Sequence, residues 1–220
     1  MRLIAHRGFA AVFPENTVLA VREAARWADA VEVDGRRCGS GEVVVLHDAT
    51  VDRVTDTSGP VREYSREQLA DLRVLDSDQG IPTLTDVFEA VPADVPLNVE
   101  LKETGLAGEV VEMAADLGRE IFLSSFESDC LREVRSAAPE VDRAYLFAED
   151  WQSSLSTADA LDCRYVHPSI ECCTTEFVAS AHERGFEVNA WTVRDRETAD
   201  RMGRRGVDGV IADSPALVEL

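Results

Sequence analysis

Lysine is almost absent from this chain. Of the 220 residues, 22 are basic, and Lys102 is the only lysine among them; all the others are arginines. The chain also lacks a long apolar run, because no stretch approaches the ~20 residues that a membrane-spanning helix needs. Proline-rich, serine-rich and low-complexity tracts are missing as well. These absences argue against membrane insertion and against a linker between domains, so we expect a single domain over residues 1–220.

Positive charge is scarce throughout the sequence. The formal net charge is −20, from 42 acidic and 22 basic residues. Nucleic acids and anionic membranes are bound by basic patches, so neither is an expected partner. An acidic chain this poor in lysine resembles proteins of a high-salt cytoplasm, and we predict a halophilic, cytoplasmic protein. Met1 leads directly into a strand-like segment, so we expect no signal peptide.

The cysteines follow no metal-binding or redox spacing. The five of them are scattered along the chain at Cys38, Cys130, Cys163, Cys172 and Cys173. In a chain without a secretion signal, such a set is typical of reduced and mostly buried thiols. The adjacent pair Cys172–Cys173 leaves metal binding or redox activity open, although no CxxC spacing supports either.

Strand-like and helix-like segments alternate along the whole chain. The strand candidates are residues 2–6, 30–34, 43–47, 96–102, 121–125, 143–147, 164–167, 187–193 and 208–212. The helix candidates are residues 16–28, 65–72, 84–91, 107–117, 128–137, 153–160, 174–184 and 195–204. Such alternation predicts a parallel sheet covered by helices. Eight units of this kind close into a (β/α)8 TIM barrel, whose active site lies at the carboxyl ends of the strands.

Nine strand candidates are one too many for this barrel. Either one candidate is not a barrel strand, or two candidates share one strand. The segments 30–34 and 43–47 are the most doubtful, because they are too close for a crossover helix to fit between them. Residues 48–82 have little strand character, and we expect them to form a small insertion after the third strand. The alternative fold is an open, doubly wound sheet. It has less support, because no GxGxxG turn follows the first strand.

Paired acidic residues lie near the end of the second predicted strand. Glu32 and Asp34 are two residues apart, so in a strand both point to the same side, about 6–7 Å apart. Two such carboxylates can share a hard cation such as Mg²⁺ or Ca²⁺. The alternative is a solvated edge or salt bridges with Arg36 and Arg37.

Glu100 and Lys102 repeat this spacing at another strand end. Glu100 offers a third oxygen ligand, and Lys102 suits a phosphoryl oxygen or a substrate hydroxyl. The alternative is an ion pair between the two side chains. A compact ammonium group differs from a planar guanidinium in a tight site. The single lysine of an arginine-rich chain at this position therefore favours a functional role.

Two histidines also follow strand-like segments. His6 and Arg7 come after residues 3–5, and His47 with Asp48 ends the most apolar strand. An imidazole beside a guanidinium suits proton transfer next to a bound phosphate. Together with the acidic residues, these side chains are typical of a metal-dependent phosphodiesterase.

In this order, the segments resemble the glycerophosphodiester phosphodiesterase family of the phospholipase-C-like phosphodiesterase barrel superfamily. The matching segments are residues 5–8, 14–17, 32–34, 47–48, 98–102, 124–126, 190–193 and 207–215. The resemblance implies that His6 and His47 are the catalytic acid–base pair. It also implies that one divalent cation, Mg²⁺ or Ca²⁺, is held by Glu32, Asp34 and Glu100.

The same resemblance implies how the substrate is held. Arg7 would bind the phosphate, and Lys102 would contact the phosphate or the glycerol moiety. Phe126 and Trp191 would form an apolar wall against the glycerol, with simple barrel packing as the alternative. Glu15 and Asn16 would support these groups. Two departures stand out, because Arg194 follows Trp191–Val193 where the family often has asparagine, and residues 36–40 lack the usual lysine.

The implied substrate is a small phosphodiester, and the implied reaction is hydrolysis of glycerophosphodiesters to sn-glycerol 3-phosphate and an alcohol. One alternative is hydrolysis of lysophospholipids, as in a lysophospholipase D. Another is a non-catalytic barrel that binds phosphorylated ligands. The sequence leaves open the headgroup, the choice of cation, which histidine acts first as base, whether water or a glycerol hydroxyl attacks, and the oligomeric state.

Overall fold

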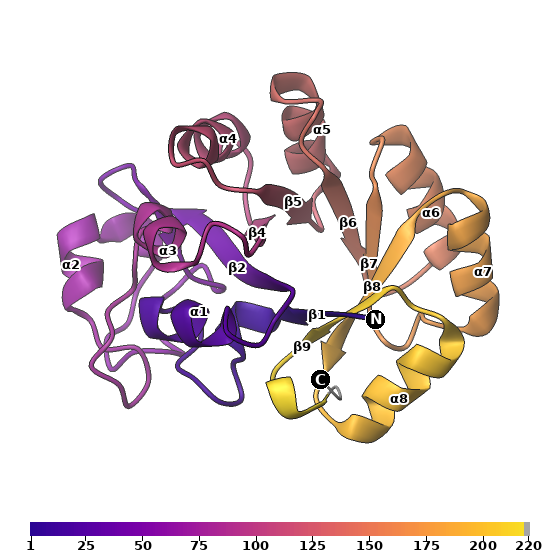
Figure 1. The fold of residues 1–220 in the computed structure, drawn as a ribbon. Coiled ribbons are helices and arrows are strands. Elements are labelled where there is room, and N and C mark those ends of the chain that lie inside the picture. Colours follow the sequence, from indigo (N-terminus) through magenta and orange to yellow (C-terminus); the bar gives the residue numbers. More distant parts are fainter. Residues whose placement is uncertain (218–220) are drawn as a thin grey trace.

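A closed barrel of eight parallel strands forms the centre of the molecule (Figure 1). The computed structural model describes residues 1–217. The barrel strands are β1 (Arg2–Ala5), β2 (Ala30–Arg37), β4 (Leu97–Leu101), β5 (Ile121–Ser125), β6 (Arg143–Phe147), β7 (Tyr165–Pro168), β8 (Glu187–Val193) and β9 (Gly209–Ala212). Strand β1 pairs with both β2 and β9, which closes the ring. The predicted TIM barrel is therefore confirmed, and the open doubly wound sheet is wrong.

Strand β3 (Val43–Val45) is the candidate that does not belong to the barrel. It runs antiparallel to the end of β2, with Gly35 opposite Val45 and Arg37 opposite Val43. The short connection between the two segments forms a hairpin, because an antiparallel pair needs no crossover helix. The extra strand therefore lies outside the ring of parallel strands.

Eight α-helices lie around the barrel in residues 1–217 (Figure 1). They are α1 (Val18–Ala24), α2 (Arg66–Asp71), α3 (Leu84–Ala90), α4 (Ala107–Asp116), α5 (Ser128–Ala137), α6 (Trp151–Ala160), α7 (Thr175–Glu183) and α8 (Arg196–Arg205). Each coincides with a predicted segment. Single-turn 3₁₀ helices occur at η1 (His6–Gly8), η2 (Val61–Glu63) and η3 (Pro215–Leu217). None of the described helices is long and apolar enough to cross a membrane.

The insertion between β3 and α3 has an apolar cluster of its own. Val44 and Leu46 pack there with Val51, Leu69 and Ile81. Helix α2 lies in this part of the molecule, beside α3 (Figure 1). Separate packing fixes the insertion against the barrel. The segment that follows β3 is therefore held in place and can present polar side chains to the barrel mouth.

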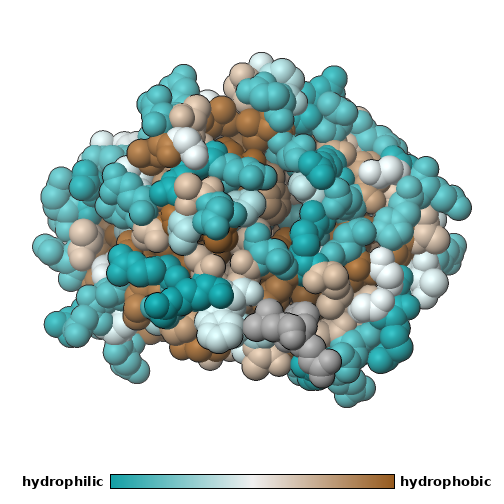
Figure 2. Space-filling view, in the orientation of Figure 1, coloured by the Kyte–Doolittle hydropathy of each residue, from teal (hydrophilic) through white to brown (hydrophobic). Residues whose placement is uncertain are grey.

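The inside of the barrel divides into an apolar and a polar level. Ile4, Ala30, Phe122, Tyr165 and Ile211 belong to one buried cluster inside the ring. Further along the strands the inward-facing residues become polar. Outside, hydrophilic residues cover most of the face shown in Figure 2, as expected for a chain of net charge −20. Inside the barrel, the buried carboxylates Glu32 and Asp34 lie on β2 and Glu100 lies on β4.

Candidate active site

The predicted site residues gather at the carboxyl ends of the barrel strands, as the fold requires. Across β2 and β4, Glu32 pairs with Asn98 and Asp34 with Glu100. Across β4 and β5, Glu100 pairs with Ser124. A cavity of about 270 Å³ opens here and is lined by His6, Arg7, Glu32, His47, Asn98, Glu100, Ser124, Phe126, Leu146, Trp191, Thr192, Arg194 and Ile211.

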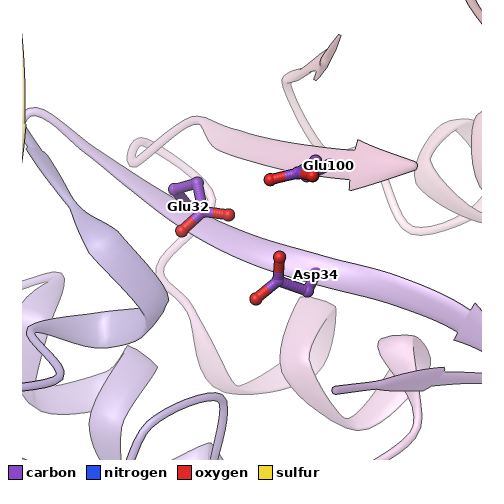
Figure 3. Close-up of side chains that lie close together, drawn as sticks. All are labelled: Glu32, Asp34 and Glu100. Carbon is purple, nitrogen blue, oxygen red and sulfur yellow. The ribbon is translucent and has the colours of Figure 1, made fainter. Parts of the chain in front are cut away.

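Three buried carboxylates converge at one side of the cavity (Figure 3). Glu32, Asp34 and Glu100 each place one oxygen within 4.8 Å of the others. The alternative salt bridges of these residues with Arg36 and Arg37 are wrong. The Arg36 guanidinium donates to the carbonyl of His47 at 2.9 Å, and Arg37 pairs with Glu109 at 2.8 Å.

This cluster suits a divalent cation. Burial raises the pKa of Glu32 well above its usual value, and repulsion from Asp34 and Glu100 raises it further. Burial, followed by the charge of Asp34, raises the pKa of Glu100 to about 7. Ionised carboxylates this close repel each other unless positive charge lies between them. Hard oxygen ligands in this arrangement fit a cation such as Mg²⁺ or Ca²⁺.

Of the three carboxylates, Asp34 has the most basic and amide side chains as partners. Its oxygens contact Lys102 Nζ at 2.9 Å, Asn16 Nδ2 at 2.7 Å and Arg7 Nε at 3.4 Å. Burial would raise the pKa of Asp34, but the charges of Lys102 and Arg7 outweigh it and hold the pKa below its usual range. Lys102 also hydrogen-bonds Glu100, so the ion pair named as the alternative forms. Lys102 thus lies behind the carboxylates rather than among the described residues that line the cavity.

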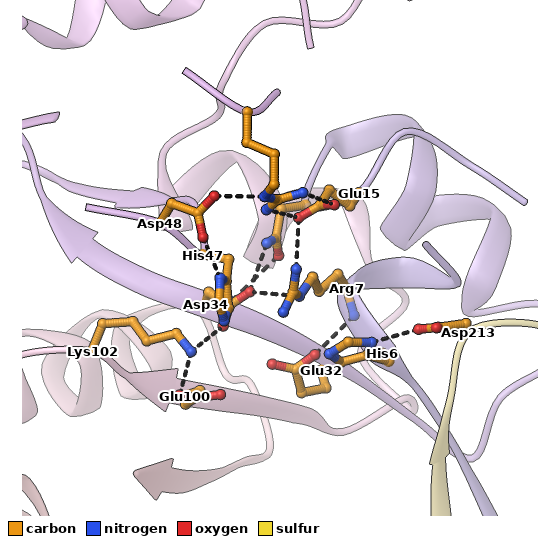
Figure 4. Close-up of polar contacts among 12 residues, drawn as sticks. His6, Arg7, Glu15, Glu32, Asp34, His47, Asp48, Glu100, Lys102 and Asp213 are labelled. Atoms are coloured by element: carbon orange, nitrogen blue, oxygen red, sulfur yellow. Dashed lines mark hydrogen bonds and ion pairs between the residues drawn. The ribbon is translucent and has the colours of Figure 1, made fainter. Parts of the chain in front are cut away.

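A tight turn after β1 brings Arg7 into this network (Figure 4). Gly8 has φ +75°, and a Cβ there would lie 2.7 Å from the Cβ of Ala20, so only glycine fits. The turn lets the backbone N–H of Arg7 donate to Glu32 Oε2 at 2.8 Å. Its side chain donates to Glu15 Oε1 at 2.9 Å. Glu15 and Asn16 therefore support the site as predicted, one through Arg7 and the other through Asp34.

Each predicted histidine is held by an aspartate. The Nδ1 atom of His6 lies 2.6 Å from Asp213 Oδ1, and that of His47 lies 2.6 Å from Asp48 Oδ1. A carboxylate at Nδ1 leaves Nε2 available for a substrate proton. Burial lowers the pKa of His47 below its usual value, and the charges of Lys102 and Arg7 lower it further. Asp34 and Asp48 raise this pKa, but they do not outweigh the other effects.

Arginines complete both arrangements. Arg194 Nε donates to Asp213 Oδ2 at 3.0 Å, and Arg53 Nε donates to Asp48 Oδ2 at 2.6 Å. Arg53 also binds both oxygens of Glu15, at 2.7 and 2.8 Å. Sequence reasoning missed Asp213 and Arg53 as site residues. Asp213 lies directly after the last predicted strand and within the matching segment 207–215, but no role was assigned to it, and Arg53 lay in a segment interpreted as a loop.

Phe126 and Trp191 lie together at the cavity, and their role as a wall against the glycerol stays a prediction. The rings of Phe126 and Trp191 meet edge to face, with centroids 5.4 Å apart, and both line the cavity. Trp191 Nε1 donates to the carbonyl of His167 at 2.7 Å, which fixes the indole. Phe126 keeps 41% of its surface exposed. An exposed aromatic ring at a cavity mouth offers an apolar contact to a ligand.

Comparisons with known proteins agree with this geometry. The sequence model of the Glycerophosphoryl diester phosphodiesterase family matches residues 6–217. The glycerophosphodiester phosphodiesterase of Caldanaerobacter subterraneus is 32% identical, over 97% of this chain and 94% of that protein.

Two solved structures are similar over nearly the full length. An Oleispira antarctica phosphodiesterase in complex with the product sn-glycerol-3-phosphate superposes with a TM-score of 0.89 at 26% identity, covering 98% of this chain and 94% of that one. The glycerophosphodiester phosphodiesterase of Thermotoga maritima gives a TM-score of 0.86 at 29% identity, covering 99% and 96%. This chain therefore belongs to the glycerophosphoryl diester phosphodiesterase family of enzymes.

Proposed function

We propose that this enzyme hydrolyses glycerophosphodiesters to sn-glycerol 3-phosphate and an alcohol, with one divalent cation, Mg²⁺ or Ca²⁺. The observation that carries the proposal is the composition of one cavity. Two aspartate-held histidines line it together with Arg7 and two carboxylates of the acidic cluster. The net charge of −20 and the single lysine support a high-salt cytoplasm as the place where the enzyme works.

Positive charge near the phosphate comes from several groups. Glu32, Asp34 and Glu100 would hold the cation, which when bound polarises a phosphoryl oxygen and offsets its negative charge. Arg7 presents its guanidinium at the cavity wall, and its planar group suits phosphate oxygens. Lys102 holds the pKa of Asp34 below its usual range, offsets part of the rise in the pKa of Glu100, and adds a second fixed charge behind them.

The two histidines move the protons. Because burial lowers the pKa of His47, its ring is neutral near pH 7 and Nε2 can accept a proton from the attacking hydroxyl. The attacking group is water, or it is the neighbouring glycerol hydroxyl, which forms a cyclic phosphate that water then opens to glycerol phosphate. His6, oriented by Asp213, then gives a proton to the oxygen of the leaving alcohol. Phe126 and Trp191 exclude water from one side of the glycerol moiety.

A panel of diesters tests this proposal. The substrates are glycerophosphocholine, glycerophosphoethanolamine, glycerophosphoglycerol and lysophosphatidylcholine, each assayed in molar and in dilute KCl with added Mg²⁺ or Ca²⁺ and with chelator. Released glycerol phosphate is measured enzymatically. We expect release from at least one glycerophosphodiester, greatest in molar KCl, and its loss with chelator. Absence of glycerol phosphate under every condition contradicts the proposal, and choline release from the lysolipid alone favours the lysophospholipase D activity.

Histidine variants test the proposed roles. His6→Ala and His47→Ala should each lower kcat/KM by about 10²- to 10⁴-fold, the range for lost acid–base catalysis. His182→Ala is the matched control, because His182 lies in α7 and pairs with Asp208 away from the cavity. The control should keep the activity of the unmodified protein. Unchanged activity in both cavity variants removes the assigned roles.

A further inference from the structure

Two buried polar side chains in the cavity wall have no partner. Asn98 is 1% exposed and Ser124 is fully buried. Neither Asn98 Oδ1 nor Ser124 Oγ makes a hydrogen bond to any described residue. An unpartnered buried polar atom costs about 1–3 kcal/mol, and native proteins keep few of them. Such a pair therefore calls for a ligand that completes its hydrogen bonds.

The two side chains lie on either side of Glu100. Asn98 precedes Glu100 by two residues on β4, so both face the barrel interior. Ser124 pairs with Glu100 from the adjacent strand β5. Asn98 and Ser124 both line the cavity that holds His6 and Arg7. The unpartnered atoms thus belong to the wall of the proposed substrate site, and we call this pair the hydroxyl floor.

The neighbouring Ser125 differs from Ser124, because its hydroxyl has hydrogen-bond partners within the protein. Ser125 is equally buried, but its hydroxyl donates to the carbonyl of Leu101 at 2.7 Å and accepts from the backbone N–H of Glu127 at 3.0 Å. Strand alternation turns Ser125 away from Ser124. His167 Nδ1 is also unpartnered, yet His167 is not among the described residues that line this cavity. Arg7 Nε and Asp34 Oδ1 lack hydrogen bonds as well, but each has an ion-pair partner, which the two atoms of the hydroxyl floor lack.

The chemistry of the pair limits what it can bind. An ester phosphate offers mainly acceptor oxygens, which the Asn98 oxygen would repel. An amide and a hydroxyl each provide both a donor and an acceptor. A neutral hydroxyl group has the same two capacities. We propose that the Asn98 amide and the Ser124 hydroxyl bind a free hydroxyl of the glycerol moiety and select glycerol esters over esters that lack it. This inference rests on the proposed function, because it assumes that the cavity receives a glycerol ester.

Binding of the product and its deoxy analogues tests the hydroxyl floor without relying on turnover. The probes are sn-glycerol 3-phosphate, propane-1,2-diol 1-phosphate and propane-1,3-diol phosphate, each of the last two lacking one hydroxyl. Affinities are measured by calorimetry in molar KCl with Mg²⁺ or Ca²⁺. The unmodified protein should bind glycerol 3-phosphate about five- to tenfold more tightly than at least one analogue, as a lost hydrogen bond implies.

Variants then assign the preference to the two residues. Ser124→Ala and Asn98→Leu should each reduce the preference to within about twofold by weakening glycerol 3-phosphate binding alone. Ser125→Ala is the matched control and should retain the full preference. Its melting temperature should fall, because it loses two hydrogen bonds, whereas that of Ser124→Ala should stay close to the unmodified value. Asn98→Ser serves as a second variant if the leucine does not fit.

Three outcomes overturn the inference. The preference stays unchanged in folded Ser124→Ala and folded Asn98 variants, or the unmodified protein shows no preference. Alternatively, the Asn98 variants lose cation affinity, measured with Mg²⁺ or Ca²⁺ alone, as strongly as glycerol phosphate affinity, which assigns Asn98 to the cation. The proposed function fails separately. The protein could bind glycerol 3-phosphate more tightly than an analogue and yet release no glycerol phosphate from any diester. That result would support the role of the hydroxyl floor and contradict the proposed hydrolysis.

Discussion

The two histidine–aspartate–arginine arrangements have nearly the same geometry but opposite origins. In each, the imidazole Nδ1 lies 2.6 Å from one carboxylate oxygen, and an arginine Nε binds the other. His47, Asp48 and Arg53 come from one short segment. His6 and Asp213 come from opposite ends of the chain, 207 residues apart. A local segment and the closure of a whole barrel therefore produce the same histidine–aspartate–arginine arrangement.

The two units differ in exposure. The side chains of His6 and Asp213 are 15% and 12% exposed, against 35% and 29% for His47 and Asp48. Ala5 pairs with Ala212 where β1 and β9 close the barrel, and this pairing brings the next residues, His6 and Asp213, together. The second depends on chain adjacency and on the insertion that carries Arg53. Because hydrogen bonds between charged groups strengthen away from water, the unit at the seam should be the more sensitive one.

Asp213→Asn should produce the largest effect. The amide cannot hold the charge that orients and stabilises the His6 imidazole, so kcat/KM should fall by about a hundredfold or more. Asp48→Asn is the matched comparison, and its more exposed pair should lose only about tenfold. Steady-state kinetics on the best substrate give both values, with thermal unfolding to show that both variants fold. Equal losses of kcat/KM in the two variants would contradict the proposal that the more buried pair is the more sensitive one.

The difference between the units also explains what the sequence could predict. Alternating segments predicted every strand and every α-helix described above, because each of these elements has its own periodicity, but they did not predict the single-turn 3₁₀ helices. The short gap before residues 43–47 indicated that one strand was extra. His47 and Asp48 could be paired from adjacency alone. The partner of His6 could not, because nothing in the spacing selects Asp213 among 42 acidic residues until β9 lies beside β1.

Other site features depend on three-dimensional context. Arg53 reaches Glu15, which lies 38 residues earlier, from a segment with no regular pattern. The lack of hydrogen-bond partners at Asn98 and Ser124 depends on the residues around them in the folded chain, so it cannot be predicted from the two residue types. Lys102 contacts Asp34 and Glu100, and its predicted contact with the phosphate or the glycerol moiety stays a prediction. Residue identities thus predicted the chemistry of the site, whereas partners and orientation required the closed barrel.

The pH profile distinguishes the two histidines. The pKa of His47 lies below its usual value, chiefly through burial, so the ring is neutral above that pKa. If His47 is the base, kcat/KM is at its maximum above this pKa. Below the pKa of His47, kcat/KM falls about tenfold per pH unit, and this falling part is the acid limb of the profile. Removing the negative charge in Asp48→Asn should move this acid limb to lower pH, since Asp48 raises the pKa of His47. A limb that moves to higher pH, or stays in place, contradicts the assignment of His47 as base.

Arg53→Gln should have a smaller effect, because it leaves both histidines and both aspartates in place. The variant loses the paired hydrogen bonds to Glu15 and the bond to Asp48. Arg7 and His47 should then be held less firmly, and kcat/KM should fall about five- to tenfold. Arg73→Gln is the matched control in the same insertion, because the exposed Asp78 is the only ion-pair partner of Arg73 within residues 1–217. A similar loss in the control would point to general destabilisation of the insertion.

Arg194→Gln should produce the smallest change. Arg194 binds Asp213 at 3.0 Å as Arg53 binds Asp48, but its side chain is 71% exposed and it has no second carboxylate partner among the described residues. An exposed ion pair contributes about 0–1 kcal/mol, so kcat/KM should fall only about two- to threefold. Kinetics with glycerophosphocholine and glycerophosphoglycerol measure this loss. A tenfold loss with either substrate would show that Arg194 contacts the substrate itself, and the two arginines would then no longer have the same role.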